Sequence, residues 1–132
     1  MNISFFLKPK LEVSYLLDDC PVRQALDDML NSGFTAIPVI GRSGKYVGTI
    51  TEGDFLRLLL SAKPEELDRM TVGQVERRVQ HRSVNIDAHM EDMVDLVAVQ
   101  NFVPVTDGRG MFCGIITRRD VINLLRGSSR KV

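Results

Sequence analysis

Two threonine–aspartate pairs with the same spacing occur in this sequence. Thr51 and Asp54 belong to the string GTITEGD, and Thr117 and Asp120 belong to GIITRRD, 66 residues later. In each string an apolar run ends in the threonine, and the aspartate falls where a helix would begin. Such a helix start offers free N–H groups to a phosphate, and an ionised aspartate can accept both hydroxyls of a ribose cis-diol. Helix capping is the alternative role, but two pairs in register favour nucleotide binding.

These pairs lie inside an internal repeat. Residues 38–59, PVIGRSGKYVGTITEGDFLRLL, align without a gap with residues 104–125, PVTDGRGMFCGIITRRDVINLL. The shared positions are a proline, turn glycines and the polar pair, so we interpret the chain as a duplicated unit. Upstream, five apolar residues with the spacing of one helix face recur 68 positions later, which makes the second copy two residues shorter. They are Val22, Ala25, Leu26, Met29 and Leu30, and then Met90, Met93, Val94, Val97 and Ala98.

Each copy is predicted to fold as β-α-β-β-α, which makes the fold class α/β of the α+β kind. In the first copy we expect a strand at 11–17, a helix ending near Leu30, strands at 36–40 and 46–50, and a helix from about Gly53. In the second copy we expect a strand at 83–86, a helix at 89–98, strands at 102–105 and 111–116, and a helix at 119–126. The predicted organisation is 1–60 for an N-terminal segment and the first repeat, 61–78 for a connector with a helical turn at 71–75, and 79–132 for the second repeat and a frayed polar tail.

The bulk composition is that of an ordinary globular domain. The 132 residues are 44% apolar and 26% charged, with 17 basic and 17 acidic residues. Because these charges cancel, we expect no binding to nucleic acid or to an anionic membrane. The N-terminal MNISFFLKP is too short for a signal peptide or a membrane span and is expected to pack on the domain. Cys20 and Cys113 occupy unrelated positions in the two copies, so we expect buried thiols and a cytoplasmic protein.

The string GFTAIPV, together with the two strings that end in the aspartates, resembles the CBS domain. The resemblance covers roughly residues 11–60 and 79–126, and two such domains in tandem form a CBS pair, or Bateman module. It implies two repeats that pack through their sheets with pseudo-two-fold symmetry, and commonly a homodimer. It also implies two clefts for adenosine-containing ligands such as AMP, ADP, ATP, S-adenosylmethionine or cyclic di-AMP. Short stand-alone pairs with F/Y-T-A-I-P-V and T-R-R include bacterial receptors for cyclic di-AMP.

Carried over residue by residue, the resemblance assigns Asp54 and Asp120 to the ribose, and Thr51 and Thr117 to the phosphate side. It implies that the second strand of each copy encloses the adenine and that the first strand reads the base through main-chain atoms. The adenine-enclosing residues are Thr35, Ala36, Ile37 and Pro38 in the first copy and Phe102, Val103 and Pro104 in the second. The base-reading residues are Val13, Ser14 and Tyr15 in the first copy and Ser83 and Val84 in the second. The Tyr15 ring is expected either to stack on a purine or to pack in the core.

The two copies differ in charge beside the threonine. Thr117 is followed by Arg118 and Arg119, whereas the first copy has Glu52 and Gly53 at these positions. A guanidinium binds phosphate and a carboxylate repels it, so the second cleft is predicted to be the better phosphate site. Another basic cluster, where the connector enters the second repeat, can either complete a cleft or form a solvated face. It consists of Arg77, Arg78, His81 and Arg82.

The sequence carries no catalytic signature. It has no nucleophile–base motif, no glycine-rich phosphate loop, and no metal-ligand spacing around His81 or His89. We therefore predict that the protein is not an enzyme, has no resident cofactor or metal, and acts as a regulatory module with an adenosine nucleotide as its ligand. Because these residues include no effector domain, we expect the module to signal to a partner protein. The alternative is a ligand-free dimerisation or protein-docking module.

Overall fold

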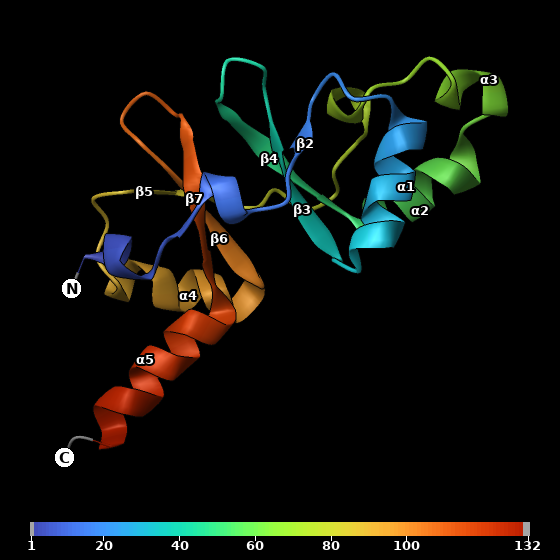
Figure 1. The fold of residues 1–132 in the computed structure, drawn as a ribbon. Helices are drawn as coiled ribbons and strands as arrows, with labels where there is room; N and C mark the ends of the chain where they lie inside the picture. The colour runs from blue at the N-terminus through green and yellow to red at the C-terminus, as the bar shows by residue number, and fades with distance from the viewer. Residues whose placement is uncertain (1, 131–132) are drawn as a thin grey trace. The chain divides into compact units, whose positions relative to one another are not determined.

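The computed structural model describes residues 2–130 and divides them into two compact units, each built around one copy of the repeat (Figure 1). The first-repeat unit comprises residues 14–80, and the second-repeat unit comprises residues 2–13 and 81–130. This grouping differs from the predicted boundaries at 60 and 78. The connector belongs to the first-repeat unit because Val72 N–H donates to Cys20 O at 2.9 Å. The N-terminal segment belongs to the second-repeat unit because Ile3 is fully buried in its core.

The first-repeat unit is a three-stranded sheet with helices packed against it (Figure 1). The strand order is β2-β3-β4, with β2 parallel to β3 and β3 antiparallel to β4. The predicted apolar helix face supplies the buried residues Val22, Ala25 and Met29. The elements are β2 (Leu16–Leu17), α1 (Val22–Ser32), β3 (Ala36–Ile40), β4 (Tyr46–Thr51), α2 (Glu52–Ser61), α3 (Pro64–Leu67) and the 3-10 helix η3 (Val72–Gln74).

The second-repeat unit repeats this arrangement and adds one strand. Its sheet has the order β1-β7-β6-β5, and α4 and α5 contact each other and the sheet. The added strand β1 pairs antiparallel with β7, with Lys8 opposite Ile115 and Pro9 opposite Gly114. The elements are η1 (Ile3–Phe6), β1 (Lys8–Pro9), η2 (Lys10–Glu12), β5 (Val84–Asn85), α4 (Glu91–Val99), β6 (Phe102–Thr106), β7 (Phe112–Thr117) and α5 (Arg118–Arg130).

The two hairpins have the same register, so the β-α-β-β-α duplication and the α+β class are confirmed. Pro38 lies opposite Thr49 in one hairpin and Pro104 lies opposite Ile115 in the other, and each register shifts once near the outer end. Because a slip of one residue would turn every side chain to the opposite face, the shared register keeps the same positions in both cores. It also brings each threonine to the end of a strand that leads directly into a helix.

Three predicted segments differ from the structure. The strand expected at 11–17 is reduced to Leu16–Leu17, because Val13 N–H donates to Lys10 O in a 3-10 turn. The connector contains α3, whose first residue is Pro64, a residue that the first helical position tolerates. Residues 127–130 of the predicted frayed tail continue α5, and residues 131–132 lie outside the described part of the chain.

Candidate functional site

In the first-repeat unit Thr51 and Asp54 bind each other at the start of α2. The Thr51 hydroxyl accepts from Asp54 N–H at 3.2 Å, and Asp54 Oδ2 accepts from Thr51 N–H at 2.9 Å. This reciprocal pair is a capping box, which satisfies two N–H groups that the helix itself leaves unpaired. The capping role that the sequence left open is therefore present in this copy.

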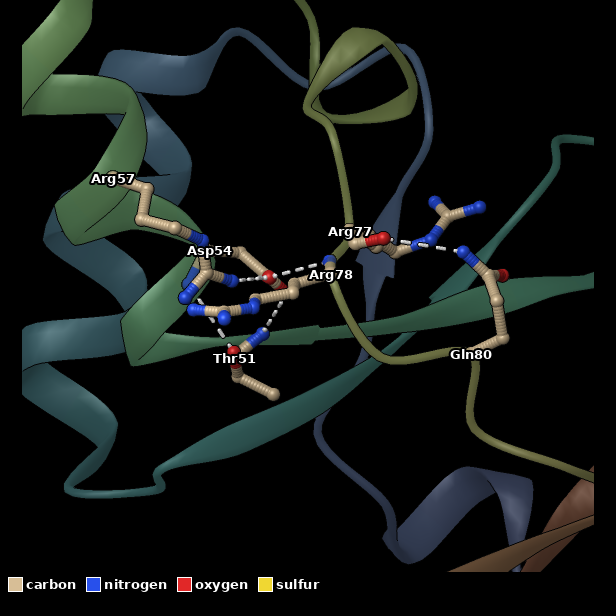
Figure 2. Close-up of polar contacts among 6 residues, drawn as sticks. All are labelled: Thr51, Asp54, Arg57, Arg77, Arg78 and Gln80. Carbon is tan, nitrogen blue, oxygen red and sulfur yellow. Dashed lines mark hydrogen bonds and ion pairs between the residues drawn. The ribbon is translucent and has the colours of Figure 1, made fainter.

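The other carboxylate oxygen of Asp54 is also occupied (Figure 2). Arg57 Nη2 donates to Asp54 Oδ1 at 2.5 Å, and the connector residue Arg78 donates its backbone N–H to the same oxygen at 3.2 Å. The Asp54 side chain is 2% exposed, whereas that of Arg57 is 44% exposed. Both oxygens thus point into contacts within the same unit rather than toward solvent.

A cavity of about 300 Å³ adjoins this cluster, between α2 and the connector. Its charged lining residues are two carboxylates and two guanidiniums, so the charges balance. The lining residues are Asp54, Arg57, Leu58, Ser61, Val75, Glu76 and Arg78. A balanced lining supplies no net attraction for a phosphate.

In the second-repeat unit the equivalent aspartate is less occupied. The Thr117 hydroxyl accepts from Asp120 N–H at 3.1 Å, as in the first copy. Among residues 2–130, however, no donor to the Asp120 carboxylate is found, and the side chain is half-buried. The carboxylate therefore retains its acceptor positions at the N-terminus of α5.

The two arginines that follow Thr117 have different surroundings. Arg118 Nε donates to Val97 O at 2.6 Å, and this carbonyl lies in the last turn of α4. Arg118 N–H donates to Asn101 O at 2.8 Å, just as Glu52 N–H donates to Thr35 O at 3.0 Å in the first copy. Arg119 is exposed, and its side chain has no hydrogen bond or ion pair within the described residues. Arg118 thus closes a helix C-terminus, and Arg119 is the arginine available to a phosphate.

Some of the residues predicted to surround the adenine have accessible side chains, and others are buried. Ile37 and Val103 are 3% and 0% exposed and belong to the two cores, so only their main-chain atoms can meet a ligand. Tyr15 is 39% exposed, so the predicted core packing of its ring is not what the structure shows. Ala36, Val13 and Val84 are half-buried; Pro38, Phe102 and Pro104 are buried; Ser14, Thr35 and Ser83 are exposed.

Several groups of the basic cluster near the second repeat contact other protein groups, so the cluster is not simply a solvated face. Arg77 lies flat on β4, and a Cβ placed on Gly48 would come within 2.8 Å of Arg77 Cζ. The backbone N–H groups of Arg78 and Arg82 bind Asp54 and Gln100 Oε1 respectively. In addition, the Arg77 Nη1 and His81 Nδ1 atoms are buried and have no hydrogen-bond partner in the part of the chain that the structure describes.

No role for Arg57 or for the Arg78 backbone was predicted from the sequence. The signal for Arg57 is its position three residues after Asp54, where helical side chains meet. No signal in the sequence indicates the Arg78 contact, because a backbone N–H is present at nearly every position. That contact depends on the path of the connector.

Cys20 and Cys113 are free, half-buried thiols. Partial burial is the main cause that raises the pKa of each thiol, and nearby aspartates raise it further. A raised pKa leaves little thiolate at neutral pH, so both cysteines are poor nucleophiles. Within residues 2–130 there is no group of three or more potential metal ligands. No helix in that range is long and apolar enough to cross a bilayer.

Comparison with protein families identifies the fold that carries this arrangement. The profile of the CBS domain matches residues 10–61 and 72–127. The chain belongs to the CBS domain family. Its two matches make it a tandem CBS protein, as the repeat predicted. A curated relative, an uncharacterized 17.7 kDa protein of Acidianus ambivalens, is 41% identical over 49 residues, which span 37% of this chain and only 30% of that protein.

Solved structures of similar fold extend over nearly the whole chain. A hypothetical conserved protein from Geobacillus kaustophilus is 29% identical and covers 97% of this chain and 98% of its own, with a TM-score of 0.84. CbpB of Listeria monocytogenes, in complex with c-di-AMP, is 22% identical with 98% of both chains covered and a TM-score of 0.84. CBSX2 of Arabidopsis thaliana, in complex with AMP, is 22% identical with 97% and 98% covered and a TM-score of 0.77. At 22% identity the last two likenesses concern the fold.

Proposed function

We propose that this tandem CBS protein is a regulatory module that binds an adenosine nucleotide and signals ligand state to a partner protein. The observation that carries the proposal is the half-buried Asp120 carboxylate, which has no donor within the described residues and stands beside the exposed Arg119 at the start of α5. The complexes of CbpB with c-di-AMP and of CBSX2 with AMP support the ligand class. We propose a cytoplasmic location because thiols such as Cys20 and Cys113 stay reduced there.

The proposed chemistry follows from the groups at the start of α5. Asp120 accepts the 2′- and 3′-hydroxyls of a ribose, since a carboxylate can accept a bidentate pair of donors. The first N–H groups of α5 and the Arg119 guanidinium bind the phosphate. The adenine-enclosing and base-reading residues predicted from the family for each copy complete the proposed cleft of that copy, with Ile37 contributing main-chain atoms in the first and Val103 in the second. None of these steps requires bond breaking, so the module is proposed to have no catalytic activity.

The proposed contact between Asp120 and the ribose diol also predicts different affinities for the candidate ligands. AMP, ADP, ATP and S-adenosylmethionine present both ribose hydroxyls, whereas 3′,5′-linked cyclic di-AMP presents one hydroxyl per ribose. We therefore propose that Asp120 favours the ligands that present both ribose hydroxyls over cyclic di-AMP. A hydrogen bond to a charged group contributes about 1.5–3 kcal/mol, which is roughly a ten-fold to hundred-fold difference in affinity.

A thermal-shift panel with calorimetric titration tests the proposal. The panel contains AMP, ADP, ATP, S-adenosylmethionine and cyclic di-AMP, with 2′-deoxy-AMP as the matched control that lacks one diol hydroxyl. A ligand at 100 times its dissociation constant stabilises the fold by about 2.7 kcal/mol, which is several degrees for a chain of this size. No shift with any of the five ligands would contradict the proposed nucleotide binding and leave the docking module as the better account.

A second function, self-association or docking, is favoured by a separate observation. An apolar groove of about 380 Å³ lies between α1 and α2, and three leucines in it are well exposed: Leu30 (74%), Leu56 (58%) and Leu59 (47%). Exposed apolar patches of this kind commonly mark an interface. We propose that this groove contributes to a homodimer, a role compatible with nucleotide binding. Analytical ultracentrifugation at tens of micromolar measures it, and a monomer throughout would contradict it.

A further inference from the structure

We propose that Arg57 determines which of the two aspartates accepts a ribose, by keeping Asp54 closed while Asp120 stays open. This inference rests on the proposed nucleotide binding and adds that the module takes one nucleotide per chain, at the second copy. Arg57 acts through Asp54, so it is a positioning residue rather than a ligand contact.

The first observation is that both carboxylate oxygens of Asp54 already accept hydrogen bonds. Oδ2 accepts from Thr51 N–H, and Oδ1 accepts from both Arg57 Nη2 and Arg78 N–H. Three donors therefore hold a side chain that is 2% exposed. A ribose diol needs two acceptor positions that solvent can reach. An ionised carboxylate has about four acceptor positions, so with three occupied a diol can bind Asp54 only after Arg57 moves away, which leaves two.

The second step is that the sequence provides space for Arg57 in the first copy. The Arg57 side chain folds back over Gly53, where a Cβ would lie 3.3 Å from Arg57 Nη1. In the second copy the position equivalent to Gly53 holds Arg119. A long side chain at that position takes up the space that the fold-back needs. The absence of a side chain at Gly53 therefore allows the Arg57 side chain to reach Asp54.

The third step is that the second copy lacks the donors themselves. The position equivalent to Arg57 is Asn123, whose Oδ1 accepts from Arg126 Nη2 at 3.3 Å. Among the described residues no backbone N–H donates to the Asp120 carboxylate either. Asp120 therefore keeps the acceptor capacity that Asp54 has lost.

The expected size of the effect follows from the energy of one charge-assisted hydrogen bond. Apparent affinity falls in proportion to the fraction of molecules in which the site is competent to bind. For one such bond the reduction is about ten-fold to a hundred-fold. The first site should therefore half-fill only at AMP concentrations ten-fold to a hundred-fold above those that half-fill the second.

Calorimetric titration with AMP tests this inference in the full chain. Wild type is expected to bind one AMP, whereas Arg57→Asn, which installs the residue of the second copy, is expected to bind two. Arg57→Lys, which keeps a cation near Asp54, is the conservative control and should bind one. The reciprocal double change Arg119→Gly with Asn123→Arg installs both residues of the first copy and should weaken AMP binding by ten-fold or more beyond the effect of Arg119→Gly alone. A merely structural role for Arg57 cannot create a second binding event.

The outcomes separate this inference from the proposed function. Two AMP sites of equal affinity in wild type overturn the inference and leave nucleotide binding intact. One site in both wild type and a folded Arg57→Asn, checked by circular dichroism, also overturns it. If Arg57→Asn does not fold, Arg57→Gln gives the same test with a longer neutral side chain. No AMP binding by any variant contradicts the inference, and no binding of any ligand in the panel contradicts the proposed function as well.

Discussion

The Lys8 carbonyl oxygen lies where a side chain on Gly114 would stand: a Cβ at that position would be 2.1 Å from it. Gly114 also has φ 151°, a region that residues with a side chain rarely adopt. This close approach lets β1 pair with β7, so a glycine in the repeat signature holds the N-terminal segment onto the second-repeat unit.

Gly114→Ala is therefore expected to detach β1 and to lower the free energy of unfolding by more than about 1–3 kcal/mol, the usual cost of a strained backbone conformation. Gly108→Ala is the matched control, because nothing lies within 4 Å of a Cβ there. Urea unfolding monitored by circular dichroism measures both. Equal stability of the two variants would show that the Lys8 approach does not constrain the fold.

Asp54 and Asp120 should give opposite results when each is changed to asparagine. Asp54→Asn places an amide donor against N–H groups and removes the charge that Arg57 binds, so it should cost about 1–3 kcal/mol of stability and leave AMP affinity nearly unchanged. Asp120→Asn should leave stability nearly unchanged and weaken AMP binding by roughly ten-fold to a hundred-fold. Thermal unfolding and calorimetric titration of both variants provide the four measurements. A loss of AMP affinity in Asp54→Asn as large as in Asp120→Asn would contradict the asymmetry.

Substitutions of Arg118 and Arg119 should also have different effects. Arg118→Ala removes the donor to Val97 O and should destabilise the fold by about 1 kcal/mol. Arg119→Ala should leave stability unchanged and weaken ATP binding by about ten-fold or more, with a smaller effect on adenosine, which has no phosphate. Added salt should reduce the Arg119 contribution, because exposed charges are screened. Titrations of ATP and adenosine at two salt concentrations measure this, and equal losses for both ligands would exclude a phosphate contact.

Leu56→Asp is expected to weaken any homodimer, because it places a charge in the apolar groove between α1 and α2. Burial of a leucine contributes about 1.5–3 kcal/mol, so the dimer dissociation constant should rise by ten-fold or more. Leu11→Asp is the control, since Leu11 is 99% exposed and lies in η2 of the other unit. Sedimentation velocity compares the two variants with wild type. Dimerisation unaffected by Leu56→Asp would place the interface elsewhere.

Local patterns accounted for most of the elements. The predicted strand at 36–40 has the observed bounds of β3, and α1 ends at Ser32, two residues after the predicted end near Leu30, with Gly33 (φ 73°) as its C-cap. These features depend on near neighbours in the chain, namely apolar spacing and a glycine that adopts a left-handed conformation without strain. The strand predicted at 11–17 was wrong over residues 11–15, because strand formation needs a partner at the right place and apolar composition alone does not supply one.

The sequence by itself determined the duplication, the two threonine–aspartate pairs and the family, because these are properties of residue identity and spacing. The sequence also predicted unequal phosphate binding from the charges beside the two threonines, but only the tertiary structure decided that the two aspartates differ in acceptor occupancy. Asp54 is closed by Arg57 and by a backbone N–H of the connector, whereas Asp120 keeps its carboxylate open. The physical reason is that acceptor occupancy depends on the path of segments distant in the sequence, and a backbone donor has no signature in the residue types that carry it.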